Sequence, residues 1–348
     1  DSTRTFKPSN YDVLTSMLIE WKFVDTPDDP PSGGWPAEEK IRRAHDGEAG
    51  ADLEAIRTSG AKPRQPMGLL KLAIGMEAFA NVALRELGEP VMTILEAMGL
   101  RMYTGPAFVK YNGVLRGLNS KVPFLQNQLV VLCCDDEAVE QFAAKAISFE
   151  QAKGRMNFYT TTLHVINSGI VKTSKLTYAG KVYRGVSGME LPDEFWHPNK
   201  HGVKGGIEAA FMSTTKDRKV AMQYAAAGGR GVVFEIQQGM IDRGADISWL
   251  SQYPHEEEIL FAPLTGLEVQ STRCDKTVLV VGVSLSVNLS SLTIEQVIGK
   301  FRKLVGDAAE GAVIDARSSM MASTAPENAD GVAELMRLAC GERGLLHR

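Results

Sequence analysis

Two glutamates lie one residue apart immediately before an apolar segment of the chain. Glu256 and Glu258 flank Glu257, and an isoleucine, a leucine and a phenylalanine follow at 259–261. In a strand, the two-residue side-chain period places Glu256 and Glu258 on the same face. Most acidic triplets are solvated turns, but two carboxylates this close repel, and the pKa of one tends to rise unless a positive charge offsets them. A reaction that develops positive charge beside them would use this arrangement.

Two further short segments carry groups that complement the carboxylates. Arg184 and Gly185 lie in the β-branched run KVYRGV. An arginine in a strand is usually a solvated edge residue, but beside a glycine that admits close backbone approach its guanidinium can bind a pyrophosphate. Ser213 lies in FMSTT, where Thr214 or Thr215 can simply cap the helix that follows. If Ser213 faces the same cleft as the glutamates, its hydroxyl can hold a carboxylate in place.

Together these segments resemble the R-S-E class of mono-ADP-ribosyltransferases, which includes arginine-modifying bacterial toxins and vertebrate ectoenzymes. Arg184 matches the arginine of the first strand in that class. FMSTT matches the Ser-Thr-Ser segment, with Thr215 in place of the last serine, and residues 256–258 match Glu-x-Glu. The order and spacing of the three segments also fit the class.

The resemblance extends upstream of these segments. YTGPAFVKYNGVLR, at 103–116, is similar to the helix that opens the domain in this family, with Tyr103, Asn112 and Arg116 in the usual places. The resemblance therefore covers residues 98–290.

The resemblance implies that NAD is the co-substrate, that no metal takes part, and that the nicotinamide–ribose bond breaks through an oxocarbenium-like state, as in glycoside cleavage. Glu258 matches the catalytic glutamate, whose fixed carboxylate stabilises that positive charge. Ser213 would orient Glu258, Arg184 would hold the phosphates, and the backbone of Gly185 would hydrogen-bond the nicotinamide amide. Thr214 belongs to the same expected NAD-binding set.

The resemblance also implies an acceptor. Glu256 matches the glutamate that receives the target guanidinium in arginine-specific members. A guanidinium is protonated, with a pKa above about 12, so it is a poor nucleophile until a carboxylate orients it and takes up its proton. The loop at 248–255 would then contact the target protein. Tyr224 and Arg230 match an aromatic and a basic residue of the family's phosphate–nicotinamide loop and would bind NAD.

Three functions are open at this point. The first is an arginine-specific protein ADP-ribosyltransferase. The second is an NAD glycohydrolase on the same fold, with water as the acceptor, although Glu256 favours the transferase. The third is a catalytically inactive binding module of a larger protein, and the presence of Arg184, Ser213 and Glu258 argues against it.

The predicted secondary structure that must position these residues changes from helices to strands along the chain. Helical patterns predominate as far as about residue 170 and are strongest over 68–87. After Lys175, short β-branched or aromatic segments separated by glycine, proline and aspartate predict strands, interrupted by one helix over 217–227. The other expected helices lie after Pro106 and at 135–147 and 154–170; the expected strands lie at 181–186, 209–215, 231–236, 245–250, 257–262, 267–270 and 277–287.

Helices followed by strands predict an α+β fold. The resemblance makes it the ADP-ribosyltransferase type, a split, mostly antiparallel β-core with surrounding helices. We expect a helical accessory segment at 1–97, the transferase domain at 98–290, and a helical, partly flexible tail at 291–348. The dense apolar run at 68–87 leaves open that the accessory helices complete one shared core.

Composition excludes several other classes. The 348 residues are 44% hydrophobic and 23% charged with a net charge of −4, as in a soluble globular protein, and show no basic footprint for nucleic acid. No apolar segment reaches the roughly 18 residues of a membrane span. The chain opens at Asp1 without a signal-peptide pattern. The few cysteines include the adjacent Cys133 and Cys134, expected as buried small hydrophobes, and favour a reducing compartment such as the cytoplasm.

Overall fold

The computed structural model describes residues 65, 67–105, 107–117, 121–188, 190–226, 231–239, 241–286, 293–321 and 329–340. The chain divides into two compact units, Asp1–Ser291 and Leu292–Arg348. Most of the expected accessory segment, residues 1–64, lies outside the described residues.

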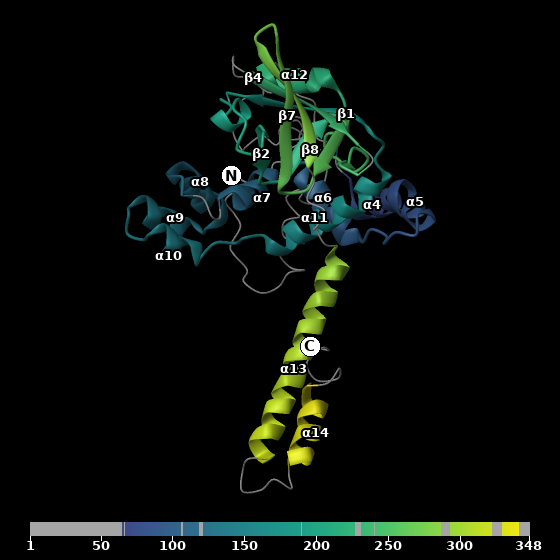
Figure 1. The fold of residues 1–348 in the computed structure, drawn as a ribbon, viewed down its shortest axis with the longest axis vertical. Coiled ribbons are helices and arrows are strands. Elements are labelled where there is room, and N and C mark those ends of the chain that lie inside the picture. Colours follow the sequence, from purple (N-terminus) through teal and green to yellow (C-terminus); the bar gives the residue numbers. More distant parts are fainter. Residues whose placement is uncertain are drawn as a thin grey trace, which may run out of the picture. The chain divides into compact units, whose positions relative to one another are not determined.

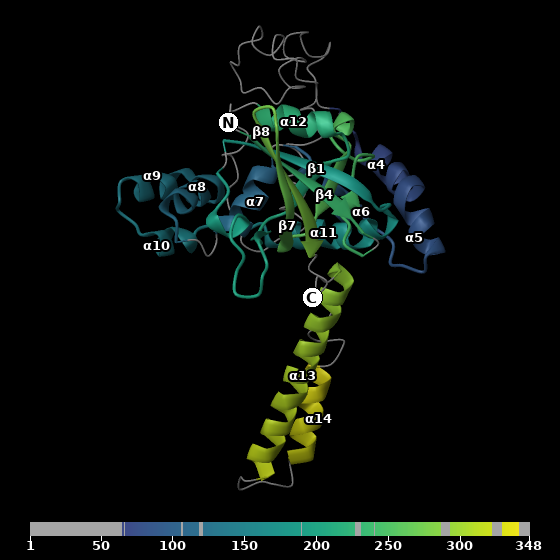
Figure 2. The ribbon, with the colours of Figure 1, turned by 45° about the horizontal axis from the view of Figure 1, so that its top comes forward.

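The first unit is built on an eight-stranded sheet (Figures 1 and 2). Its strand order is β2-β7-β8-β4-β1-β3-β6-β5, and every neighbouring pair is antiparallel except β4 and β8. This arrangement confirms the predicted α+β fold with a mostly antiparallel core. The strands are β1 Gly180–Ser187, β2 Gly205–Glu208, β3 Met212–Thr215, β4 Gly231–Gln238, β5 Ala245–Asp246, β6 Glu258–Phe261, β7 Thr265–Asp275 and β8 Val278–Ser286.

The sheet is nearly divided between β1 and β3. These two strands are joined by one paired position, Tyr183 opposite Thr215. On either side the pairing is extensive, since β1 pairs with β4 along its whole length and β3 pairs with β6 along all of its own. The sheet therefore consists of two half-sheets, which meet where β1 lies beside β3.

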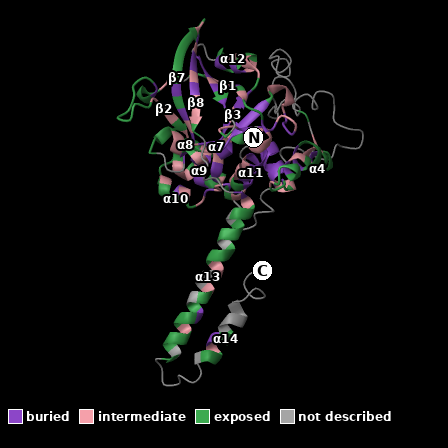
Figure 3. Cartoon of the chain, turned by 45° about the vertical axis from the view of Figure 1, so that its right-hand side comes forward, coloured by how far each residue is buried: buried purple, intermediate pink, exposed green. Residues whose placement is uncertain are grey.

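Helices cover the sheet at opposite ends (Figures 1 and 2). Helix α12, Arg218–Ala226, lies at one end, and the N-terminal helices form a layer at the other. Buried residues concentrate in the strands and in the helices next to them (Figure 3). The N-terminal layer contains α4 Leu69–Met76, the π-helical turn η1 Glu77–Asn81, α5 Val82–Glu86, α6 Ile94–Tyr103, α7 Phe108–Gly117, α8 Pro123–Cys133, α9 Asp136–Ala143, α10 Phe149–Lys153 and α11 Thr160–Thr173; the 3₁₀ turns are η2 Ser174–Leu176, η3 Asp193–Phe195 and η4 Pro254–Glu256.

A buried ion pair ties α6 to α11. Thr93 caps α6 through a capping box with Glu96. The Glu96 carboxylate also accepts hydrogen bonds from Ser168 and, at 2.9 Å, from Lys172 Nζ. Lys172 is 1% exposed and Glu96 is fully buried. The expected boundary at residues 97/98 falls inside α6, and apolar residues from both sides of it, such as Leu72, belong to one core cluster.

Helix α12 lies against the sheet because two glycines face it. A Cβ atom at Gly185 of β1 would lie 1.9 Å from the carbonyl oxygen of Ala221, and one at Gly231 of β4 would lie 2.0 Å from that of Ala225. No side chain fits at either position, so the two glycines fix how closely α12 packs on β1 and β4.

Several elements differ from the sequence predictions. The strand expected at 245–250 stops at Asp246, because the Asp246 carboxylate accepts hydrogen bonds from the backbone and side chain of Ser248 and turns the chain. The helix expected at 154–170 begins at Thr160, after Tyr159 adopts a left-handed conformation. Strand β2 and helix α8 were not predicted. Two glycines open β2 and remove the β-branched pattern that marks strands.

Cys133 and Cys134 are 1% and 6% exposed, so their prediction as buried small side chains is confirmed. Among the described residues, no helix has both the length and the apolar character needed to cross a membrane.

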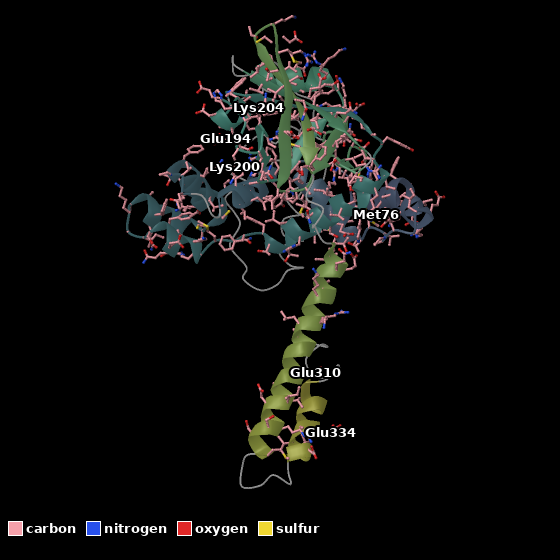
Figure 4. The ribbon with its side chains drawn as sticks, in the orientation of Figure 1. Met76, Glu194, Lys200, Lys204, Glu310 and Glu334 are labelled. Atoms are coloured by element: carbon pink, nitrogen blue, oxygen red, sulfur yellow. The ribbon has the colours of Figure 1, made fainter. Side chains whose placement is uncertain are left out.

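The second unit is a pair of helices, α13 Ile294–Met321 and α14 Ala329–Cys340, on which Figure 4 marks Glu310 and Glu334. Arg317 Nε donates to Asp330 Oδ1 at 2.7 Å. Helix α13 lies in the predicted helical tail and continues through Gly306, because the alanine-rich sequence that follows has high helix propensity.

We expect a chain that starts at residue 98 to lose its cooperative unfolding transition. It would lack Glu96, leaving Lys172 buried without its carboxylate, at a cost of about 3–5 kcal/mol. It would also lack Leu72 and Leu84, both fully buried. Urea unfolding of the truncated and full-length chains, followed by circular dichroism, measures this. A truncated chain that unfolds as sharply as the full-length one would show that the accessory helices form a separate unit.

Candidate functional site

A cleft of about 410 Å³ opens where β1 and β3 meet. Its volume is within the usual range for sites that bind small molecules. The predicted site residues within the described part of the chain all line it: Arg184, Gly185, Ser213, Thr214, Tyr224, Glu256 and Glu258. Arg230 lies outside the described residues.

Ser213 and Glu258 come together across β3 and β6. Thr215 pairs directly with Glu258, so Ser213, two residues earlier, shares the face from which Glu258 projects. The Ser213 hydroxyl donates to Glu258 Oε1 at 2.5 Å. Glu258 is 6% exposed. The hydrogen bond holds the carboxylate in one orientation at the base of the cleft.

Burial raises the pKa of Glu258 to about 7. The hydrogen bond from Ser213 opposes this rise, the negative charge of Glu256 adds to it, and the guanidinium of Arg184 opposes it. The carboxyl group therefore changes charge near neutral pH, which is common for groups at catalytic sites.

Glu256 reaches the cleft from a turn and not from a strand. It ends the 3₁₀ turn η4, Glu257 follows with φ +46°, and β6 begins only at Glu258. The prediction that Glu256 and Glu258 share a strand face was wrong in its local structure, because the left-handed residue between them breaks the strand. Both side chains nevertheless line the cleft, and Glu257 is exposed.

Two hydroxyl groups hold Glu256. The Thr215 hydroxyl donates to its backbone carbonyl at 2.6 Å. The Tyr224 hydroxyl donates to its Oε1 atom, also at 2.6 Å. Ser213 and Thr215, two residues apart on β3, thus fix Glu258 through its side chain and Glu256 through its backbone. The threonine that replaces serine in the Ser-Thr-Ser pattern keeps a hydroxyl donor there.

Arg184 lies beside a second guanidinium that the sequence prediction did not place in the cleft. Its Nη1 atom donates to the Ser213 carbonyl at 2.8 Å, and its Nη2 atom lies 3.9 Å from Glu208 Oε2. Arg116 of α7 binds the same carboxylate in a bidentate pair, with both distances 3.0 Å. Both arginines line the cleft. Sequence alone gave no signal for Glu208, since it ends the unpredicted strand β2.

Two other predicted residues make structural contacts. Gly185 has no room for a side chain, because α12 packs directly against it. The Thr214 hydroxyl donates to the backbone carbonyl of Ile259 at 2.8 Å and so joins β3 to β6.

A buried hydrogen-bond chain connects the helical layer to the cleft. Asn112 Nδ2 donates to the Tyr103 hydroxyl at 3.1 Å, and that hydroxyl donates to the Phe211 carbonyl, just before β3, at 3.3 Å. Burial raises the pKa of Tyr103, so the phenol stays neutral. The chain fixes α6 and α7 against the strand that carries Ser213. Among the described residues, no three His, Cys, Asp or Glu side chains gather as metal ligands would.

The sequence model of the NAD:arginine ADP-ribosyltransferase family matches residues 141–287. This span carries β1, β3 and β6 and therefore Arg184, Ser213 and both glutamates. This match confirms the predicted resemblance to the mono-ADP-ribosyltransferase family. NAD is the co-substrate of this family. A comparison with curated proteins gave no match.

Solved structures of bacterial ADP-ribosyltransferases and effectors are similar to the chain at low sequence identity. HopU1 of Pseudomonas syringae is 18% identical over 63% of this chain and 88% of its own, with a TM-score of 0.41. The Vis toxin of Vibrio splendidus is 18% identical over 64% and 85%, with a TM-score of 0.37. The type III effector XopAI of Xanthomonas axonopodis is 14% identical over 81% and 95%, with a TM-score of 0.38.

Replacing Glu258 with glutamine should stabilise the protein at pH 8 and have little effect at pH 5. The unfolded carboxyl ionises at its ordinary pKa of 4.5 and the folded one at about 7. The folded state therefore binds the proton more tightly, and wild-type stability falls as pH rises between these values. Above pH 7 the difference reaches the order of 3 kcal/mol in the free energy of unfolding. Urea unfolding at both pH values measures it, and equal effects at pH 5 and pH 8 would contradict the raised pKa.

Proposed function

We propose that the chain transfers ADP-ribose from NAD to the side chain of arginine in a protein. The observation that carries the proposal is that two carboxylates line one cleft and are held there in different ways. Glu258 is buried and fixed by Ser213, whereas Glu256 is held at a turn by Thr215 and Tyr224. A buried carboxylate suits a charge that develops within the substrate, and one presented from a turn suits an incoming partner.

NAD binds along the cleft between β1 and β6 in this proposal. Arg184 holds the pyrophosphate, since a guanidinium offers several N–H donors in a planar array that matches phosphate oxygens. The backbone of Gly185 hydrogen-bonds the nicotinamide amide, and Thr214 lines the same cleft. Tyr224 and Arg230 complete the set of NAD contacts that the family resemblance implies.

Glu258 stabilises the transition state for cleavage. The bond between ribose C1′ and the nicotinamide nitrogen breaks, and its electron pair leaves with nicotinamide. Positive charge develops on the ribose as it does so, and a fixed, poorly solvated carboxylate lowers the energy of that charge. Ser213 keeps the carboxylate in place, so little reorganisation is needed during the reaction.

Glu256 receives the acceptor. A nitrogen of the arginine guanidinium forms the new bond to C1′ while Glu256 orients the group and takes up the proton that it loses. The products are ADP-ribosyl-arginine, nicotinamide and a proton, so the reaction balances without another reactant. The loop at 248–255, which leads into Glu256, contacts the acceptor protein. Hydrolysis to free ADP-ribose would need Glu258 but would make no use of Glu256.

Substitution of each glutamate separates transfer from hydrolysis. Glu258→Gln keeps the shape and removes the charge, so nicotinamide release should fall by about 10²–10³-fold whichever acceptor is used. Glu256→Gln should lower the formation of ADP-ribosyl-agmatine at least tenfold more than it lowers nicotinamide release. Labelled NAD, with and without agmatine as the arginine analogue, gives both rates.

Glu257→Gln is the matched control, because Glu257 lies between the two glutamates and is exposed. It should keep both rates near the wild-type values. If Glu256→Gln lowers both rates equally, Glu256 belongs to the NAD site and the arginine acceptor is wrong. If the wild type releases nicotinamide and labels no acceptor, the protein is an NAD glycohydrolase.

A further inference from the structure

Tyr224 and Glu256 meet across the cleft from two different elements. Tyr224 lies on α12 and Glu256 ends η4, 32 residues later in the chain. The tyrosine hydroxyl donates to Glu256 Oε1 at 2.6 Å, a short bond of the kind formed with an ionised acceptor. The family resemblance matched Tyr224 to an NAD contact, but its hydroxyl is directed to the carboxylate proposed for the acceptor.

The helix that carries Tyr224 has little freedom to move. Ala221 lies about one turn before it and Ala225 directly after it, and both pack against the glycines of β1 and β4, where an added Cβ would clash with their carbonyl oxygens. Both alanines are buried, and they belong to a small core cluster with Val233. Tyr224 therefore projects from a fixed base, although 55% of the residue is exposed at the mouth of the cleft.

Glu256 needs a second attachment besides its backbone. Thr215 fixes the backbone carbonyl of Glu256, but the glutamate side chain has several rotatable bonds. Holding that side chain in the one geometry that the acceptor requires costs conformational entropy. Glu256 is also close enough to Glu258 to raise the pKa of the latter, so the two carboxylates repel. The hydroxyl of Tyr224 holds the Glu256 carboxylate in the cleft against both tendencies.

We propose that Tyr224 is the positioning residue of the acceptor site: it binds Oε1 of Glu256 so that Oε2 is presented to the guanidinium of the acceptor arginine. The proposal rests on the transfer function proposed above. It makes the choice between transfer and hydrolysis depend on one phenolic hydroxyl outside the Arg-Ser-Glu triad. Desolvation, together with the hydrogen bond to Glu256, raises the pKa of Tyr224, so the hydroxyl remains a donor throughout the neutral range.

Tyr224→Phe removes the hydroxyl and keeps the ring, so any stacking of the ring on NAD is retained. The quantity measured is the ratio of ADP-ribosyl-agmatine formed to nicotinamide released, which a general loss of folded protein does not change. We expect this ratio to fall about tenfold, as for the loss of a hydrogen bond to a charged group. In a Glu256→Gln background, the same substitution should leave the ratio unchanged, since the two residues act as one unit.

Tyr178→Phe is the matched control, since Tyr178 is 90% exposed and does not line the cleft. It should keep the wild-type ratio. If the wild type labels agmatine and Tyr224→Phe keeps the wild-type ratio, or lowers the ratio equally in the Glu256→Gln background, Tyr224 does not act through Glu256 and the inference is wrong while the transfer function stands. If the wild type labels no agmatine, the transfer function fails and the inference fails with it.

Discussion

Glu258 is a carboxylate that the fold removes from water at the junction of two half-sheets, and a single serine hydroxyl keeps it there. Burying such a group destabilises the protein whenever the group is charged. The surrounding groups reduce this cost, because Ser213 donates a hydrogen bond and Arg184 contributes positive charge. A site that stabilises a positive transition state benefits from a carboxylate that water does not screen.

Strand pairing, hydrogen bonds and helix packing elsewhere in the first unit position the residues at that junction. One paired position joins β1 to β3, so Arg184 and Ser213 approach each other without a continuous ladder between their strands. The hydrogen-bond chain from Asn112 through Tyr103 fixes the helical layer to the start of β3. On the opposite side, glycines in β1 and β4 let α12 pack closely enough for Tyr224 to reach Glu256. The close packing of α12 on β1 and β4 therefore also positions the carboxylate of Glu256.

Much of this site could be predicted from sequence because its chemistry lies in short, contiguous segments. Arg184, Ser213, Glu256 and Glu258 line one cleft as the motifs indicated. Other contacts between distant segments were not predicted, among them the pair of Arg116 with Glu208, 92 residues apart. The left-handed turn at Glu257 was missed because an acidic residue before an apolar run fits a strand equally well. Helix α6 runs through the predicted domain boundary, since periodicity shows where a helix lies and not which core it completes.

The central claim is that the Glu258 carboxylate itself acts on NAD. The pH dependence of nicotinamide release at low NAD concentration, from pH 5 to pH 9, tests it most directly, because kcat/KM reports the pKa of groups in the free enzyme. Glu258 must be ionised to stabilise positive charge, and its pKa is raised to about 7. We predict that kcat/KM rises through about pH 7 and then reaches a plateau. A profile that is flat between pH 5 and pH 9, or one that falls through pH 7, would contradict the account.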